Sequence, residues 1–131
     1  MFSTYPLLIS LDPNQWKVKE GLWIFKNLLH RAIQIREQYA ALELKNYGRT
    51  WSRDEVLLGF VGDVGDFAKL ALVESGVREI PDAKQKLAHE LADCLWSLLV
   101  LSHSYNINLE EAFLQTMDEL QEHIKSNLAK D

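Results

Sequence analysis

Residues 56–68 read VLLGFVGDVGDFA, an apolar stretch whose only charged residues are Asp63 and Asp66. At about 100° per residue, helical spacing places Asp63 within the apolar face of this segment and Asp66 one step to its side. A carboxylate on an apolar face is desolvated, which is costly unless the group is paired or coordinates a cation. The stretch therefore predicts a largely buried helix that carries an acidic site.

A second stretch has a similar arrangement. Residues 86–101 read KLAHELADCLWSLLVL, in which Glu90 and Asp93 lead directly into an apolar run. Spacing of i, i+3 puts these two acids on one helix face, as it does for Asp63 and Asp66. The helix then becomes apolar nearly all round, so we expect it to be central in the fold.

Two neighbouring antiparallel helices that each offer two acids form a four-carboxylate cluster. Four like charges in a low dielectric need a counter-ion, and oxygen ligands favour Mg²⁺, Ca²⁺ or Mn²⁺. An alternative remains open, in which the acids lie on solvated faces and are neutralised by Lys69, Lys84 or Lys86. A di-iron bundle is less consistent with the sequence, because it requires Glu-x-x-His pairs that do not occur here.

Apolar periodicity along the rest of the chain predicts four helices, short loops and no trustworthy strand, which makes the fold class all-α and the architecture a four-helix bundle. The predicted segments are about Trp16 to Leu44, Ser52 to Ser75, Asp82 to Tyr105 and Asn108 to Asn127. Gly48 is suited to follow the end of the first helix. The stretches Ser52–Glu55 and Asn108–Glu111 have the pattern of capping boxes, and the Asp82 side chain is expected to cap the third helix.

Length, composition and charge limit the classes of function. The chain has 131 residues, enough for a single domain spanning residues 1–131, with residues 1–15 as an irregular lead-in. Its formal net charge of −5 argues against binding to a nucleic-acid polymer through overall charge. The longest apolar run is too short for a membrane span. Because it has a single cysteine and no signal-peptide pattern, we expect a cytoplasmic protein.

Three short motifs together indicate a family. Residues 61–68 read VGDVGDFA, residues 89–95 read HELADCL, and residues 105–113 read YNINLEEAF. In this order, the chain resembles the MazG-like all-α nucleoside triphosphate pyrophosphohydrolases over roughly residues 47–120. The first motif is similar to V-G-E-V-G-E-L-A of the dCTP-pyrophosphatase-like branch, and the second to E-E-L-A-D-V-L.

The resemblance implies an enzyme that uses Mg²⁺, with Mn²⁺ as a possible replacement, to cleave a nucleoside triphosphate to a monophosphate and pyrophosphate. It assigns Asp63, Asp66, Glu90 and Asp93 as metal ligands and catalytic residues. Carboxylates suit this chemistry, since a Mg²⁺ ion held by them bridges phosphate oxygens and offsets their charge. The family habit, and more apolar surface than four helices can bury, predict a homodimer or a dimer of dimers.

The sequence departs from the family pattern in two places. Asp63 and Asp66 replace glutamates, which shortens each ligand arm by one methylene. In the last helix, Thr116 and Leu120 stand where the family has a Lys and an Asn that hold phosphates. These departures favour an alternative function, that of a catalytically weak or inactive module that binds nucleotide or metal or mediates oligomer contacts.

Candidate substrate-binding residues follow from the same resemblance. Family members often stack the base on aromatic residues of the N-terminal region, which makes Trp23 and Trp51 candidates. Lys69 and Lys86, or a basic residue from a partner subunit, are candidates to replace the missing phosphate contacts. Core or subunit packing for the tryptophans, and plain surface exposure for the lysines, remain the alternatives.

Overall fold

The computed structural model describes residues 18–76 and 79–130, and it confirms an all-α fold of four helices. The helices are α1 (Val18–Tyr47), α2 (Arg53–Glu74), α3 (Ala83–Ser104) and α4 (Leu109–Leu128). The described residues contain no strand. The predicted lead-in of residues 1–15 and the predicted helix start at Trp16 lie outside the described residues.

Local signals set most of the helix boundaries as the sequence predicts. Ser52 and Glu55 form a complete capping box, in which each side chain accepts a hydrogen bond from the backbone N–H of the other residue. At the start of α4, the Asn108 side chain accepts a hydrogen bond from the Glu111 N–H, but the Glu111 carboxylate accepts from the Asn108 side-chain amide and not from its backbone, so the predicted capping box is only half formed. Gly48 follows α1 with a φ of 72° and donates its N–H to the Leu44 carbonyl, a left-handed termination that favours glycine.

The prediction for Asp82 is wrong. Asp82 precedes α3, but its side chain makes no capping hydrogen bond. Its backbone is left-handed, with a φ of 56°, whereas a capping side chain reaches the first amides of a helix from an extended backbone. Aspartate is one of the few residues that adopts this conformation readily, so here it forms the turn instead of the cap.

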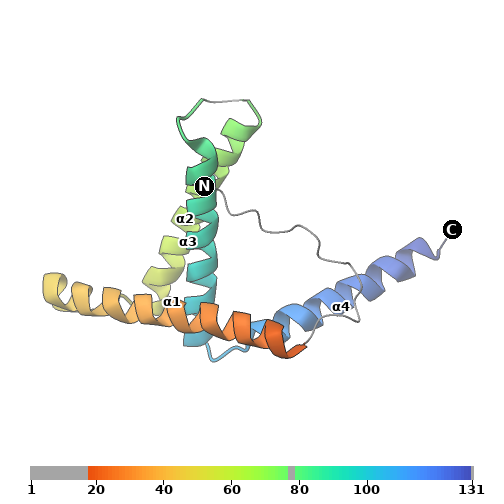
Figure 1. Ribbon diagram of the computed structural model, residues 1–131, viewed down its shortest axis with the longest axis horizontal. Coiled ribbons are helices and arrows are strands. Elements are labelled where there is room, and N and C mark those ends of the chain that lie inside the picture. Colours follow the sequence, from red (N-terminus) through yellow and green to blue (C-terminus); the bar gives the residue numbers. More distant parts are fainter. Residues whose placement is uncertain (1–17, 77–78, 131) are drawn as a thin grey trace.

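The core lies where α1 crosses the antiparallel pair of α2 and α3 (Figure 1). Val56, Val100 and Leu101 form its buried centre, and partly buried side chains that include Trp96 pack against them. The Trp96 indole N–H also donates a hydrogen bond to the Ala32 carbonyl at 3.1 Å, which joins α3 to α1. Thus α3 is the helix that contacts both others, in agreement with its central position predicted from the sequence.

Helix α4 diverges from this core, so the four helices of one chain do not close into a bundle (Figure 1). None of its described residues is buried. Nevertheless, it carries large apolar side chains at helical spacing that are 39–74% exposed: Phe113, Met117, Leu120, Ile124 and Leu128. Within the described ranges, no helix is long and apolar enough to cross a bilayer.

Candidate metal centre

Helices α2 and α3 bring three of the four predicted acids together. One carboxylate oxygen each from Asp63, Glu90 and Asp93 lies within 4.8 Å of the other two, and all three residues are half-buried. Glu90 and Asp93 share a face of α3 through their i, i+3 spacing, and Asp63 faces them from α2. The predicted convergence of acids from two antiparallel helices therefore holds for these three residues.

Asp66 lies outside this cluster. Its carboxylate is exposed and forms an ion pair with Lys69 at 2.8 Å, one turn further along α2. The helical rotation that places Asp63 toward α3 turns Asp66 to the side, as the sequence periodicity already indicated. Lys69 and Asp66, predicted for separate roles, are thus partners on the surface of α2.

The three clustered carboxylates have the chemistry that a hard divalent cation needs. Two oxygens on one Mg²⁺ at 2.0–2.1 Å are at most about 4.2 Å apart, and on Ca²⁺ about 5.2 Å apart. The 4.8 Å limit of the cluster falls between these two values. The donor set therefore fits a hard divalent cation without selecting one.

Negative charge accumulates at the centre without a strong cation beside it. In the described part of the chain, no Lys or Arg forms an ion pair with Asp63, Glu90 or Asp93. Only His89 approaches, with its Nε2 atom 3.2 Å from an Asp93 oxygen. Protonation of one carboxyl or binding of an external cation would relieve the repulsion among three carboxylates at this distance.

The surroundings of Asp63 agree with this deficit of positive charge. Burial raises the pKa of the Asp63 carboxyl above its usual value, and the Asp93 charge raises it further. The hydroxyl of Ser97 opposes this shift by donating a hydrogen bond to Asp63 at 3.4 Å. Burial and the Asp63 charge also raise the pKa of the Cys94 thiol, so Cys94 is protonated at neutral pH and is a poor nucleophile.

Of the two candidate tryptophans, Trp51 is the one with a described contact to α2. A Cβ at Gly59 would lie 3.8 Å from the Trp51 ring, and Gly59 precedes Asp63 by one helical turn. The ring is therefore beside α2 on the approach to the acidic cluster, and the Trp51 residue is 48% exposed. Trp23 is 69% exposed near the start of α1, and Lys86 is exposed in the first turn of α3.

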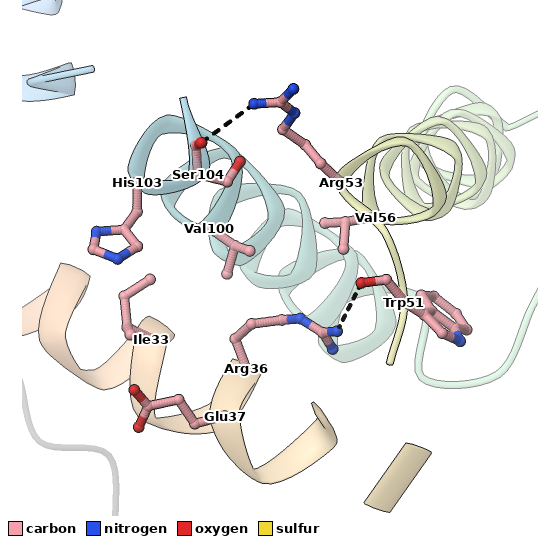
Figure 2. Close-up of a pocket in the computed structure, with 9 residues that line it drawn as sticks. All are labelled: Ile33, Arg36, Glu37, Trp51, Arg53, Val56, Val100, His103 and Ser104. Carbon is pink, nitrogen blue, oxygen red and sulfur yellow. Dashed lines mark hydrogen bonds between the residues drawn. The ribbon is translucent and has the colours of Figure 1, made fainter. Parts of the chain in front are cut away.

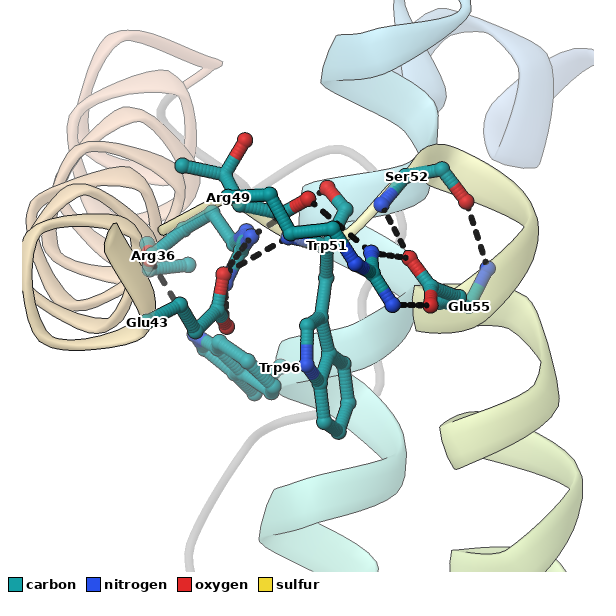
Figure 3. Close-up of polar contacts among 9 residues, drawn as sticks. Arg36, Glu43, Arg49, Trp51, Ser52, Glu55 and Trp96 are labelled. Carbon is teal, nitrogen blue, oxygen red and sulfur yellow. Dashed lines mark hydrogen bonds and ion pairs between the residues drawn. The ribbon is translucent and has the colours of Figure 1, made fainter. Parts of the chain in front are cut away.

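The sequence analysis missed a polar network at the junction of α1 and α2, shown in Figure 3. Arg36 donates two hydrogen bonds to the buried Glu43 carboxylate, at 2.7 and 2.8 Å. Glu43 also accepts the Trp51 backbone N–H at 2.8 Å. Arg36 and Glu43 lie two turns apart on one face of α1, and this spacing was the available signal. The network fixes the short loop that carries Trp51.

A cavity of about 270 Å³ lies at the same junction, where Ile33, Trp51, Arg53, Val100 and His103 contribute to its lining (Figure 2). The Arg53 guanidinium stacks on the Tyr105 ring at 4.0 Å and donates to the Ser104 carbonyl at 3.3 Å. Val56 also lines this cavity. It precedes Asp63 by two helical turns, about 10 Å along α2, so the cavity is separate from the acidic cluster.

Comparison with known proteins gives a family match over the region that carries Glu90 and Asp93. The family model of the MazG nucleotide pyrophosphohydrolase domain matches residues 72–126, which span the end of α2, all of α3 and most of α4. Asp63 and Asp66 precede the matched segment, and the match does not resolve a branch of the superfamily. No curated protein and no solved structure gives a significant match. Over residues 72–126 the chain is therefore similar to MazG nucleotide pyrophosphohydrolase domains, and its all-α fold agrees with this similarity.

Proposed function

We propose that the protein is a metal-dependent nucleotide pyrophosphohydrolase, which cleaves a nucleoside triphosphate or a modified nucleotide to a monophosphate and pyrophosphate. The observation that carries this proposal is the convergence of Asp63, Glu90 and Asp93 without a Lys or Arg partner among the described residues. A MazG domain match over two of these acids supports the same reaction class.

Within this function, Asp63, Glu90 and Asp93 hold Mg²⁺, or Mn²⁺ in its place. A bound divalent cation offsets the charge of the phosphate oxygens and helps to activate water. Asp66 is proposed as a fourth ligand. Its exposed ion pair with Lys69 has little net stability, so Asp66 can turn toward the centre and release Lys69 to contact phosphate.

For the nucleobase, we propose Trp51 as the stacking residue. Its ring lies beside Gly59, one turn before Asp63, and exposed aromatic faces suit base stacking. Trp23 and Lys86 remain predicted substrate contacts. Both are exposed, and no described contact links either of them to the acidic cluster.

We also propose that a second copy of the chain covers two apolar faces that one copy leaves exposed. The first is the stripe of large side chains on α4, defined above. The second is a face of α2 on which exposed apolar and small residues lie to either side of Lys69: Leu58, Val61, Gly62, Gly65 and Leu72. Apart from the local helix backbone, no atom of residues 18–76 or 79–130 lies within 4 Å of a Cβ placed at Gly62 or Gly65.

The two faces suit one another in shape. The α4 stripe is a ridge of large side chains, whereas the glycines make the α2 face shallow enough for close approach. If α4 of each copy packs on α2 of the other, both faces are buried twice and the assembly closes with twofold symmetry. A dimer, or a dimer of dimers, then supplies the burial that an isolated 20-residue helix needs in water.

A catalytically weak or inactive binding module is the second candidate function. The observation that favours it is on α4, where Thr116 and Leu120 stand in place of phosphate-holding residues. Leu120 is 49% exposed, and the Thr116 hydroxyl donates to the Ala112 carbonyl of its own helix. Neither side chain offers a cation to a triphosphate.

A pyrophosphate-release screen separates the two functions. Canonical and modified nucleoside triphosphates are tested with Mg²⁺ and with Mn²⁺, using wild type, Asp93→Ala and the control Asp118→Ala. Asp118 is exposed on α4, outside the acidic cluster. Loss of several kcal/mol of electrostatic stabilisation predicts a rate more than about 100-fold lower for Asp93→Ala alone. A wild type no faster than Asp93→Ala with every substrate would exclude the enzyme function.

Sedimentation tests the second-copy proposal. We expect wild type to sediment as a dimer or tetramer and Leu120→Glu as a smaller species, because a charge in the α4 stripe is costly to bury. The control is Gln115→Glu, an exposed position on the opposite side of α4. A monomeric wild type, or a Leu120→Glu variant that assembles like wild type, would contradict the proposed interface.

A further inference from the structure

Ser97 is the most deeply buried side chain among the described residues, with 2% exposure. It lies on α3 one turn after Asp93, so it shares the helix face that points at the acidic cluster. Its hydroxyl donates across the helix interface to an Asp63 oxygen on α2, at 3.4 Å. The bond is long for a hydroxyl donor.

The direction of the Ser97 hydroxyl differs from that of its neighbours on α3. Ser102 and Ser104 donate to the carbonyls of Leu99 and Leu101 on their own helix, at 2.9 and 2.8 Å. This local bond is the usual choice for serine inside a helix. The Ser97 hydroxyl instead donates to the Asp63 carboxylate, which belongs to another helix.

We propose that Ser97 is a positioning residue, whose hydroxyl orients Asp63 for cation binding. The inference rests on the proposed function, because it assigns Asp63 to a metal centre. A hydrogen bond restricts the orientations of a carboxylate, so less conformational entropy is lost when the carboxylate binds a metal ion. Removal of such a hydrogen-bond partner typically weakens metal affinity 10–100-fold. Ser97 acts through Asp63 and contacts neither metal nor substrate in this role.

The test is the Mn²⁺ dissociation constant, measured by titration calorimetry on the full chain. Removing the hydroxyl in Ser97→Ala is expected to weaken Mn²⁺ binding about 10-fold or more. Ser97→Thr retains a hydroxyl and is expected to recover most of the affinity. The matched control is Ser102→Ala, which removes a buried serine hydroxyl from the same helix at a distance from Asp63, and its Mn²⁺ affinity should equal that of wild type.

Three outcomes would overturn the proposal. The first is an unchanged Mn²⁺ affinity in Ser97→Ala while Asp63→Asn no longer binds. The second is an equal loss in Ser97→Ala and Ser102→Ala, which indicates a general effect on α3. The third is a wild type that binds no Mn²⁺, which removes the proposed function together with this inference. Denaturation curves confirm that each variant is folded. If Ser97→Ala does not fold, Ser97→Cys, with similar volume and a weaker donor, takes its place and is expected to bind Mn²⁺ more weakly than wild type.

Discussion

Two groups of carboxylates, one where α1 meets the start of α2 and the other between α2 and α3, have opposite electrostatic surroundings. At the junction with α1, Glu43 and Glu55 are each bound by an arginine through two hydrogen bonds, and these partners lower the pKa of both carboxyls. Two turns beyond this junction, Asp63 faces other carboxylates, and burial raises its pKa. Glu43 and Glu55 each have an arginine partner within the chain, whereas Asp63 has no Lys or Arg partner among the described residues.

This difference distinguishes a structural acid from a candidate ligand. A carboxylate with a fixed arginine partner stabilises the fold and is not free to bind a metal ion. A carboxylate that is half-buried among other carboxylates opposes folding unless a cation arrives from outside. The comparison therefore predicts that mutations at the α1–α2 junction and in the acidic cluster have opposite effects on stability.

The largest effect is expected from Glu43→Gln. Breaking a buried ion pair leaves the Arg36 charge uncompensated, and we expect a loss of about 3 kcal/mol in the free energy of unfolding. Chemical denaturation measures this change, and the control is Glu37→Gln, an exposed acid on the same helix. Equal stability of Glu43→Gln and wild type would show that the Arg36–Glu43 ion pair does not stabilise the fold.

Asp63→Asn is expected to act in the opposite direction. Without metal, its free energy of unfolding should equal or exceed that of wild type, because a repelled and desolvated charge has been removed. With Mn²⁺ at 100 times its dissociation constant, wild type should gain about 2.7 kcal/mol and the variant should gain nothing. Thermal denaturation with and without Mn²⁺ measures both effects. An identical Mn²⁺ response in the two proteins would contradict a metal centre at Asp63.

The pH dependence of stability sharpens the same contrast. The pKa of Glu55 falls from 4.5 to about 2 on folding, so its contribution is complete above pH 4.5 and is lost as the pH falls toward 2. For Asp63 the sign is reversed, because its folded pKa lies above 3.8. In the absence of metal, the stability of wild type relative to Asp63→Asn should therefore fall as the pH rises through that raised pKa. Denaturation midpoints measured across this pH range test both signs.

Arg49→Gln should give the smallest change. The Arg49–Glu55 pair is exposed, so solvent and salt screen its charges. Glu55 also retains its bond from the Ser52 N–H in the capping box. We expect a small decrease in the denaturation midpoint that disappears in high salt. A decrease as large as that of Glu43→Gln would show that exposure does not separate the two arginine pairs.

The sequence was sufficient to predict the four helices and the meeting of three acids. Both depend on local spacing: apolar periodicity defines the helices, and i, i+3 spacing orients the acids. The partner of Asp66 could not be predicted in this way. Its angle on the helix does not show whether its carboxylate binds a metal ion or pairs with the nearby Lys69. Asp82 was predicted incorrectly, because capping depends on a backbone conformation that its residue type leaves open.

Features that depend on contacts between distant segments were less accessible. Arg36 and Glu43 are two charged residues on a helix that appears amphipathic, and only the crossing of α1 over α2 buries them against Trp51. The divergence of α4 was also not predicted, because its apolar stripe looks the same whether the partner is in the same chain or in another. A single sequence gives the face of a helix but not the surface that covers it.

The hydrogen bonds around Trp51 have a consequence for ligand entropy. Its backbone N–H is held by Glu43 at 2.8 Å, and its carbonyl accepts a bond from Arg36 at 3.5 Å. The main chain that carries the indole is therefore already ordered before any ligand arrives. A base that stacks on Trp51 has only side-chain rotations left to restrict, which lowers the cost of association. In this sense the Arg36–Glu43 ion pair of α1 holds in place the aromatic surface that we propose for the base.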